Sequence, residues 1–331
     1  MSDHLKIIPI FLPYAGCKHR CIFCDQPGST GVAERPTPEK LDEIIRDYLK
    51  TSSEYEIAFY GGTFTGLDVK TQEGYLKIVE KWIRKGKIRY IRISTRPDEI
   101  DENISKFLKE NHVRVIEIGV QSMDDRVLEA SRRAHTAEDS ARAIKILKKY
   151  GFEVGAHLMT GLPKSTYESD IKSAKIVADL GVDTARIHPT LVFRNTELHR
   201  MMEKGRYVPL SIEEALERTA DMLAIFECKG IKVIRMGLHV PVELRKNIAA
   251  GPFHPSFGDM TRSYLMRKMI LFLGIKDVVF PEKYKGWFYS YGNRRMFLEK
   301  EVKLSLGERF SFDGKGYGET LCSYVKERLR W

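Results

Sequence analysis

The sequence of 331 residues contains no long hydrophobic run. The most apolar stretch near its start, Ile7 to Leu12, is interrupted by Pro9 and followed by Pro13. A membrane-spanning helix needs about 20 apolar residues, and a secretory signal needs an unbroken apolar centre. We therefore expect no membrane span and no signal peptide, and we expect the protein to be cytoplasmic.

The sequence also lacks the cysteine pattern of a disulfide-rich secreted domain, which spreads an even number of cysteines along a short chain. It has five cysteines, of which Cys17, Cys21 and Cys24 are crowded together while Cys228 and Cys322 stand alone. A tight cluster in a long chain indicates metal or redox chemistry. We expect Cys228 and Cys322 to be thiols in the core or on the surface rather than metal ligands.

The sequence has fewer acidic than basic residues, 45 against 55, which gives it a net charge of +10. Such a charge attracts a phosphate-rich partner such as tRNA, but it is equally typical of an ordinary solvated surface. The candidate RNA contacts near the C-terminus are Arg262, Arg267, Lys268, Arg294 and Arg295.

Short segments rich in Ile and Val alternate with longer amphipathic segments up to residue 237. The predicted strands are Lys6–Leu12, Glu56–Tyr60, Arg89–Thr95, Arg114–Val120, Glu153–Met159, Thr184–Thr190 and Lys232–Arg235. The predicted helices are Pro38–Leu49, Val69–Arg84, Asp101–Glu110, Ala137–Tyr150, Thr166–Leu180 and Ile212–Lys229. Repeated strand-then-helix units predict a parallel sheet with helices packed outside it.

Six or seven such units are too few for a closed eight-unit barrel, so a partial barrel and a doubly wound sheet both fit the periodicity. In either fold, ligands bind at the carboxyl ends of the strands. We divide the chain into a core domain, 1–237, and a small α+β C-terminal extension, 238–331. Within the extension, we expect His239–Gly258 to be loop-like and Thr261–Leu273 to be a helix.

The three clustered cysteines have the spacing Cys17-x3-Cys21-x2-Cys24 and directly follow the first predicted strand. A cubane iron–sulfur cluster with three protein thiolates keeps one iron open, and catalysis at a metal needs an open position. Structural zinc needs four ligands, and His19 is the only further candidate in the loop. The spacing therefore favours an iron–sulfur cluster over zinc.

Glycines and polar side chains follow the predicted strands. Adjacent glycines, Gly61 and Gly62, let the backbone approach a ligand closely, although such a pair is also common in tight turns. Arg133 is able to bind a carboxylate with both arms of its guanidinium. His157, on an apolar strand, is by default an ordinary core histidine. Strand ends of this kind also occur at Ser94-Thr-Arg96-Pro-Asp98 and at Gly119-Val-Gln121-Ser122.

The cysteine spacing resembles the motif of the radical S-adenosylmethionine (SAM) superfamily, Cys-x3-Cys-x-aromatic-Cys, with Phe23 as the aromatic residue. From about residue 6 to 237, the order of the strand-end motifs resembles the Elongator-subunit-3-like branch, with coproporphyrinogen dehydrogenase as a more distant relative. The resemblance implies a partial (β/α)6 barrel, a [4Fe-4S] cluster on Cys17, Cys21 and Cys24, and cleavage of SAM to a 5′-deoxyadenosyl radical. It also implies an electron donor such as flavodoxin or ferredoxin.

The same resemblance assigns residues to the SAM site. Gly61, Gly62 and Thr63 would contact the amino-acid part of SAM, Gln121 its ribose and Arg133 its carboxylate. His157 would face the SAM pocket. The resemblance assigns Arg96 to the SAM site less directly, and this residue could face the substrate instead.

The Elongator subunit also carries a C-terminal acetyltransferase domain, and residues 238–331 are too few and wrongly patterned for it. We therefore do not expect acetyl transfer. We expect a radical SAM enzyme acting on RNA such as tRNA. The alternatives are a radical SAM enzyme with a small-molecule substrate and a non-catalytic RNA-binding module that keeps the cluster as a structural element.

Overall fold

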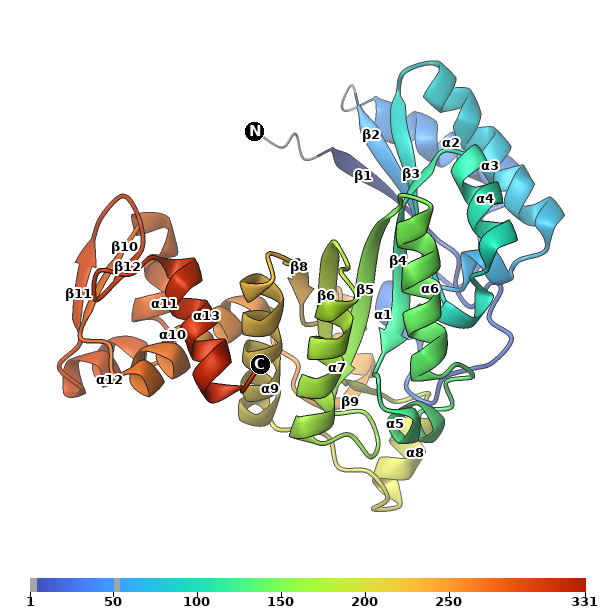
Figure 1. Cartoon of the computed structure of the whole chain (residues 1–331). Coiled ribbons are helices and arrows are strands. Elements are labelled where there is room, and N and C mark those ends of the chain that lie inside the picture. Colours follow the sequence, from blue (N-terminus) through green and yellow to red (C-terminus); the bar gives the residue numbers. More distant parts are fainter. Residues whose placement is uncertain (1–4, 51–53) are drawn as a thin grey trace.

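The computed structural model describes residues 5–50 and 54–331. Seven parallel strands form one sheet in the order β1-β2-β3-β4-β5-β6-β8. Their bounds are β1 Lys6–Phe11, β2 Tyr55–Tyr60, β3 Ile88–Thr95, β4 Val113–Gln121, β5 Glu153–Thr160, β6 Thr184–Pro189 and β8 Lys232–Met236. Because neighbours in the sheet follow chain order without a reversal, the sheet curls into a partial barrel and is not doubly wound (Figure 1).

The connecting helices cover the outer face of the curled sheet (Figure 1). The long ones are α2 Pro38–Leu49, α3 Val69–Arg84, α4 Glu102–Glu110, α6 Ala137–Lys149, α7 Tyr167–Asp179 and α9 Ile212–Cys228. Their starts follow local capping chemistry, since Thr37 accepts from the amide of Lys40 and Ser211 forms a capping box with Glu214. The predicted strands and helices up to residue 237 are thus confirmed, with bounds that differ by at most one residue at each end.

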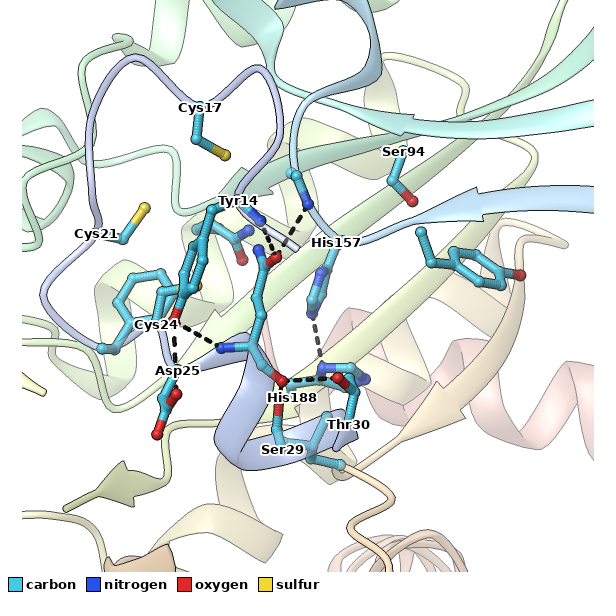
Figure 2. A pocket seen from close by; sticks show the side chains of 18 of the residues that line it. Tyr14, Cys17, Cys21, Cys24, Asp25, Ser29, Thr30, Ser94, His157 and His188 are labelled. Atoms are coloured by element: carbon cyan, nitrogen blue, oxygen red, sulfur yellow. Dashed lines mark hydrogen bonds between the residues drawn. The ribbon is translucent and has the colours of Figure 1, made fainter. Parts of the chain in front are cut away.

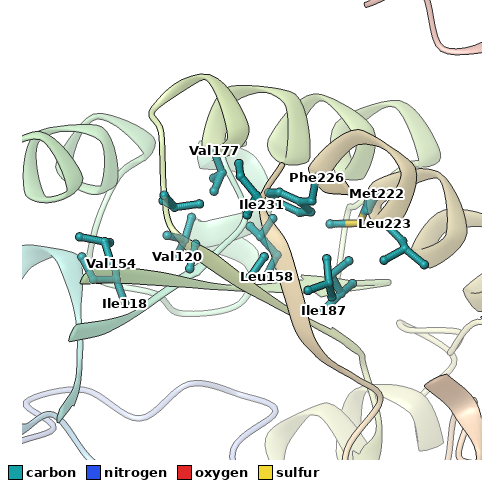
Figure 3. Close-up of a cluster of buried hydrophobic side chains, with 14 of the residues drawn as sticks. Ile118, Val120, Val154, Leu158, Val177, Ile187, Met222, Leu223, Phe226 and Ile231 are labelled. Atoms are coloured by element: carbon teal, nitrogen blue, oxygen red, sulfur yellow. The ribbon is translucent and has the colours of Figure 1, made fainter. Parts of the chain in front are cut away.

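Alternation along each strand divides its side chains between two environments. On β5, Val154 and Leu158 are fully buried against the helices, while His157 and Met159 face the inside of the barrel. Figure 3 shows the outer layer, in which strand residues such as Leu158 and Ile187 lie beside Phe226 and Met222 of α9 in one buried cluster. This apolar layer carries the hydrophobic stabilisation and leaves the inner face free for polar side chains.

Short elements complete the barrel and its carboxyl-end rim. They are α1 Gln26–Thr30, α5 Asp125–Ala130, β7 Val192–Phe193, α8 Glu197–Glu203 and β9 Ile248–Ala250. The prediction of a loop over His239–Gly258 is wrong in part, because a 3-10 helix, Val242–Asn247, and β9 lie within it. β9 pairs with β7, a partner about 55 residues away that local sequence does not reveal.

The C-terminal part contains a separate three-stranded sheet in the order β11-β10-β12. Its elements are α10 Phe257–Leu273, β10 Asp277–Phe280, α11 Lys285–Tyr289, α12 Asn293–Glu299, β11 Lys303–Leu306, β12 Ser311–Phe312 and α13 Tyr317–Arg328. Helix α10 begins four residues before the predicted helix. Leu265 and Met269 of α10 belong to the same apolar cluster as the barrel core. The division of the chain after residue 237 stays a prediction.

A buried carboxylate joins this part to the barrel. Asp221 of α9 is fully buried and accepts hydrogen bonds from the hydroxyls of Tyr167 and Tyr324, each at 2.6 Å. The ammonium of Lys268 lies 2.6 Å from the same carboxylate, and Arg262 pairs with Glu227 at 2.7 Å. Two of the five candidate RNA contacts are therefore engaged in holding α10 on α9.

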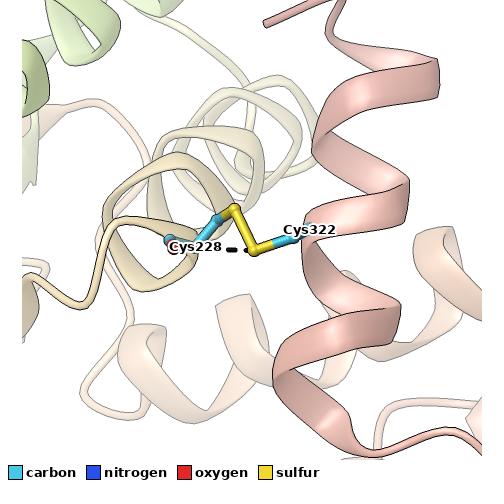
Figure 4. Close-up of a disulfide and its surroundings, with 2 residues drawn as sticks. All are labelled: Cys228 and Cys322. Atoms are coloured by element: carbon cyan, nitrogen blue, oxygen red, sulfur yellow. Dashed lines mark hydrogen bonds between the residues drawn. A yellow bond between two sulfur atoms is a disulfide. The ribbon is translucent and has the colours of Figure 1, made fainter.

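The expectation that Cys228 and Cys322 are separate thiols is wrong. They form a disulfide between the end of α9 and α13, with their Cα atoms 5.2 Å apart (Figure 4). The two residues are 94 positions apart in the sequence. Only the packing of α13 against α9 brings them together.

None of the helices formed by residues 5–50 and 54–331 combines the length and the apolar character needed to cross a bilayer.

Candidate active site

A pocket of about 930 Å³ opens at the carboxyl ends of the strands and extends down the inside of the barrel. This volume is near the upper end of the range typical of ligand sites, roughly 300–1,000 Å³. Every site residue predicted from the sequence lines this one pocket: Cys17, Cys21, Phe23, Cys24, Gly61, Gly62, Thr63, Gln121, Arg133 and His157.

The cysteine loop is seated on the turn that follows β2. The amide of Thr63 donates to the carbonyl of Ala15 at 2.7 Å, and the Thr63 hydroxyl lies 3.3 Å from the Cys17 sulfur. The close packing of the cysteine loop on this turn requires a glycine in each of the two segments. A Cβ on Gly16 would lie 2.1 Å from the Thr63 carbonyl oxygen, and one on Gly62 would lie 2.3 Å from that of Ala15.

Gln26, which sequence reasoning overlooked, ties the loop and the turn together. Its side-chain oxygen accepts from the amide of Tyr14 at 2.6 Å and from that of Gly62 at 3.2 Å. In return, the amide of Gln26 donates to the Tyr14 hydroxyl at 3.0 Å, as Figure 2 shows. The only signal in the sequence was the position of a polar residue directly after the cysteine motif.

The three thiols lie on one loop, with the sulfur atoms of Cys17 and Cys21 pointing into the space that the loop encloses (Figure 2). Burial raises the pKa of Cys17, and burial together with Cys21 and Cys17 raises the pKa of Cys24 to about 12. Thiolates at these positions therefore need a positive partner, which the irons of a cluster provide.

Over the part of the chain that the structure describes, no three Cys, His, Asp or Glu side chains converge on a position for a single metal ion. The thiolates that hold a cubane bind different irons and do not need to converge on one point. Three thiolates on one loop are the protein ligands that such a cluster needs, whereas structural zinc needs four ligands.

Arg133 lies in the segment after α5, and its side chain reaches the cysteine loop. Its guanidinium donates to the Cys21 sulfur at 3.2 Å and to the Gly119 carbonyl at 2.6 Å. Within the described ranges, its Nε and the side-chain oxygen of Gln121 are buried without a hydrogen-bond partner. Unpaired buried polar atoms are costly, so both positions suit a ligand that carries a carboxylate and hydroxyl groups.

Arg96 is almost completely buried and forms a forked ion pair with Asp98, at 2.9 and 2.7 Å. Its third nitrogen, Nη1, has no partner in the described part of the chain, and Arg96 lines the pocket. The guanidinium is therefore held in place by its own loop and still has one free donor.

His157 is not an isolated core histidine. Its Nε2 lies 2.8 Å from Nδ1 of His188 on the neighbouring strand, and the two rings meet edge to face (Figure 2). Burial, with Arg186 and Arg133 nearby, lowers the pKa of His157 to about 3. Burial and His157 also lower the pKa of His188. The pair is therefore neutral at physiological pH and offers hydrogen-bonding groups without charge.

Below the histidines, ionic side chains cross the inner face of the sheet. Arg92 of β3 pairs with Glu56 at 2.9 Å and with Glu117 at 3.0 Å. Glu117 is shared with Arg186 of β6 at 2.7 Å. All four side chains are at most one-fifth exposed, and two of them, Glu117 and Arg186, line the pocket.

Residues 11–177 match the radical SAM superfamily, and residues 182–267 match the radical SAM C-terminal domain. The chain is 28% identical over 308 residues to a tRNA uridine(34) acetyltransferase of Methanocaldococcus infernus, covering 80% of this chain and 57% of that protein. It is 30% identical over 305 residues to the tRNA uridine(34) acetyltransferase of Methanocaldococcus jannaschii, covering 79% and 56%. It thus spans a little over half the length of these relatives.

Among solved structures, the archaeal Elp3 of Methanocaldococcus infernus has a TM-score of 0.65 at 24% identity, with 80% of this chain and 63% of that chain covered. This likeness shows that the two share a fold. The match to the superfamily covers half of the chain and includes the cysteine loop, the glycine turn and the Arg133 segment described above. The chain therefore belongs to the radical SAM superfamily of enzymes, whose cofactors are a [4Fe-4S] cluster and SAM, and it is similar to the Elongator-subunit-3-like branch.

Proposed function

We propose that this enzyme binds its [4Fe-4S] cluster through Cys17, Cys21 and Cys24 and acts on RNA of the tRNA type. When bound, the cluster and SAM supply one-electron cleavage of SAM and abstraction of a hydrogen atom from the substrate. The observation that carries the proposal is that all ten predicted residues line one pocket, with the cysteine loop docked on the Gly61–Gly62 turn.

The chain's own residues would position SAM. We assign the amino-acid end of SAM to Gly61, Gly62 and Thr63, because this turn lies against the cysteine loop. The free Nε of Arg133 suits the carboxylate, and the unpaired side-chain oxygen of Gln121 suits a ribose hydroxyl. Phe23, within the cysteine loop, packs against the apolar cluster that contains Val192 and would help to exclude water.

RNA as the substrate is supported by the net charge of +10 and by the relatives, whose names state that they act on tRNA uridine. A reduced flavodoxin or ferredoxin would supply the electron, and we place the enzyme in the cytoplasm. Hydrogen abstraction inside a pocket requires the reacting nucleotide to leave its stack, as other base-modifying enzymes require.

The cluster assignment is tested with Cys21→Ser and, as the matched control, Cys228→Ser combined with Cys322→Ser. After anaerobic reconstitution with SAM and dithionite, we expect the wild type and the control to show iron–sulfur absorbance and to release 5′-deoxyadenosine. Cys21→Ser should lose both. A Cys21→Ser protein that still cleaves SAM would contradict the assignment.

The same reconstitution separates a radical SAM enzyme from a non-catalytic RNA-binding module. A wild-type cluster that is reduced but never consumes SAM would indicate a structural cluster in an RNA-binding module. Mass spectrometry of anaerobically purified enzyme identifies the bound ligand. Co-purified tRNA whose retention falls as salt is raised supports the RNA substrate, whereas a bound small molecule without RNA contradicts it.

A further inference from the structure

The ionic cluster on the inner face of the sheet lies beside one further cation that no carboxylate pairs with among the described residues. Glu56 and Glu117 face Arg92 and Arg186, and these four side chains account for each other's charge. Arg235 of β8 lines the pocket, and it has no ion pair or hydrogen bond within the ranges that the structure describes. Arg92, Arg186 and Arg235 are thus three guanidiniums for the two carboxylates Glu56 and Glu117, and of these five side chains Glu117, Arg186 and Arg235 line the pocket.

The backbone places this extra cation beside another one. Residues of β6 and β8 pair in register up to Ala185 and Val233, and after one skipped residue, Ile234, Arg186 pairs with Arg235. Without this irregularity, Arg186 would be paired with Ile234, and the guanidinium of Arg235 would lie on the other face. A bulge of this kind redirects a side chain, and bulges are common beside active sites.

Like charges directly opposite each other on neighbouring strands repel, and an anion between them would relieve the repulsion. The side chain of Arg235 is exposed to solvent, yet partial burial and the charge of Arg186 lower its pKa, with Tyr60 and Glu117 acting in the opposite direction. Glu117, the carboxylate whose charge acts on Arg235, already binds Arg92 and Arg186. Nε of Arg186 is buried and lacks a partner among the described residues, so the pair has both unbalanced charge and a spare donor.

We propose that Arg186 and Arg235 form a binding site for an anionic group of the substrate, a carboxylate or a phosphate. Guanidiniums suit both groups because their planar N–H donors match pairs of oxygens. Arg133 is the arginine assigned to the SAM carboxylate, so this second pair is available to another ligand. The inference deepens the proposed function and rests on it, because the anion belongs to the molecule that this enzyme would modify.

The test uses the full chain with its cluster reconstituted and measures binding by anaerobic calorimetry. The probes are uridine 3′-monophosphate, glutarate and, as the neutral reference, uridine. The variants are Arg235→Gln and the matched control Lys232→Gln, which removes the same charge from an exposed residue of β8 outside the pocket. The melting temperature and SAM binding of each variant report whether the fold is intact.

We expect one of the anionic probes to bind the wild type and to bind Arg235→Gln about tenfold more weakly, as the loss of one charge-assisted hydrogen bond predicts. Lys232→Gln and the uridine reference should be unaffected. Tighter binding of uridine 3′-monophosphate would identify an RNA phosphate, and tighter binding of glutarate a small-molecule carboxylate. Either result supports the site.

The site is refuted if neither anion binds the wild type more tightly than Arg235→Gln, or if Lys232→Gln weakens binding equally. These results are independent of the proposed function, which is judged by release of 5′-deoxyadenosine. An enzyme that cleaves SAM without anion selectivity would refute the site alone. Anion binding without SAM cleavage would refute the proposed function alone.

Discussion

Gly62 lies where the turn after β2 meets the cysteine loop, and its backbone adopts a φ of +34°. A Cβ at this position would approach the carbonyl oxygens of Ala15 and Leu12 to 2.3 and 2.6 Å. These contacts are with backbone rather than with a flexible side chain, so the loop itself would have to move. The pair of glycines is thus a requirement of close packing between the two segments that we assign to the cluster and to SAM.

Gly62→Ala should therefore displace the cysteine loop, lower the free energy of unfolding by about 1–3 kcal/mol and reduce the iron content after reconstitution. The matched control is Gly74→Ala in α3, where a Cβ would meet nothing within 4 Å. The control should stabilise the protein by about 0.5–1 kcal/mol, because alanine is the better helix former. Urea unfolding and iron analysis measure both effects. Full iron content and unchanged unfolding in Gly62→Ala would show that the loop is not held as described.

At the scale of single residues, the sequence pointed to the cysteines and Arg133 as cofactor ligands, and this assignment stays a prediction. Their residue types and spacing are those that a cluster and a carboxylate would need. Gln26 and His188 were not singled out because the partners that give them a role, Gly62 and His157, are distant in sequence. Cys228 was misjudged for the same reason.

At the scale of elements, β5 and β6 bring His157 and His188 together. The strands pair in parallel, with His157 beside Arg186 and Met159 beside His188. The side chains at alternate positions face the barrel interior, so the two rings meet across the strands. Burial keeps both histidines neutral in the folded protein, and this has a consequence for stability.

The folded protein should lose stability as the pH falls from 7 to 5. The pKa of His157 is about 3 when folded and near 6.5 when unfolded, so between these values only the unfolded chain gains the proton. The free energy of unfolding then falls by about 1.4 kcal/mol per pH unit below 6.5 for each such histidine, on the order of 2 kcal/mol at pH 5 for His157 alone.

Urea unfolding at several pH values checks this, with the double variant His157→Asn and His188→Asn compared with the wild type. The double variant should lose less stability on acidification. His112→Asn, at an exposed position, is the control and should follow the wild type. Parallel pH profiles for the wild type and the double variant would show that the pair does not titrate as argued.

Elements were predicted well where a periodic pattern meets a clear boundary. Buried strands of Ile and Val, and helices with capping residues such as Thr37 and Ser211, start and end where the sequence indicates. The irregularity in β8 and the pairing of β9 with β7 were not predictable. Both depend on which strand becomes the neighbour, and that is settled by tertiary packing.

At the scale of the whole molecule, the disulfide between Cys228 and Cys322 fastens α13 to the last helix of the barrel (Figure 4). The buried carboxylate of Asp221 binds side chains from α7, α10 and α13 in the same region. The C-terminal part is therefore joined to the barrel by a covalent link and a polar network, in addition to apolar packing.

Cys228→Ser combined with Cys322→Ser should lower the free energy of unfolding by about 2–4 kcal/mol, because the disulfide closes a long loop in the unfolded chain. Cluster content should not change, since neither cysteine lines the pocket. Urea unfolding and iron analysis measure the two effects. Alkylation of the denatured, unreduced wild type should leave both cysteines unmodified. Rapid labelling of Cys322 would mean that the disulfide is absent.

The sequence by itself predicted the α/β class from periodicity and capping, and the resemblance of its motifs indicated the family, the partial barrel and the residues that we assign to the cofactors. Tertiary structure alone decided that Cys228 meets Cys322 and that Arg235 pairs with Arg186. Each of these depends on segments that are far apart in the chain and are brought together by burial of apolar surface. The hydrophobic effect depends on how much apolar surface is buried and not on which segments bury it, so a local sequence pattern does not predict these pairings.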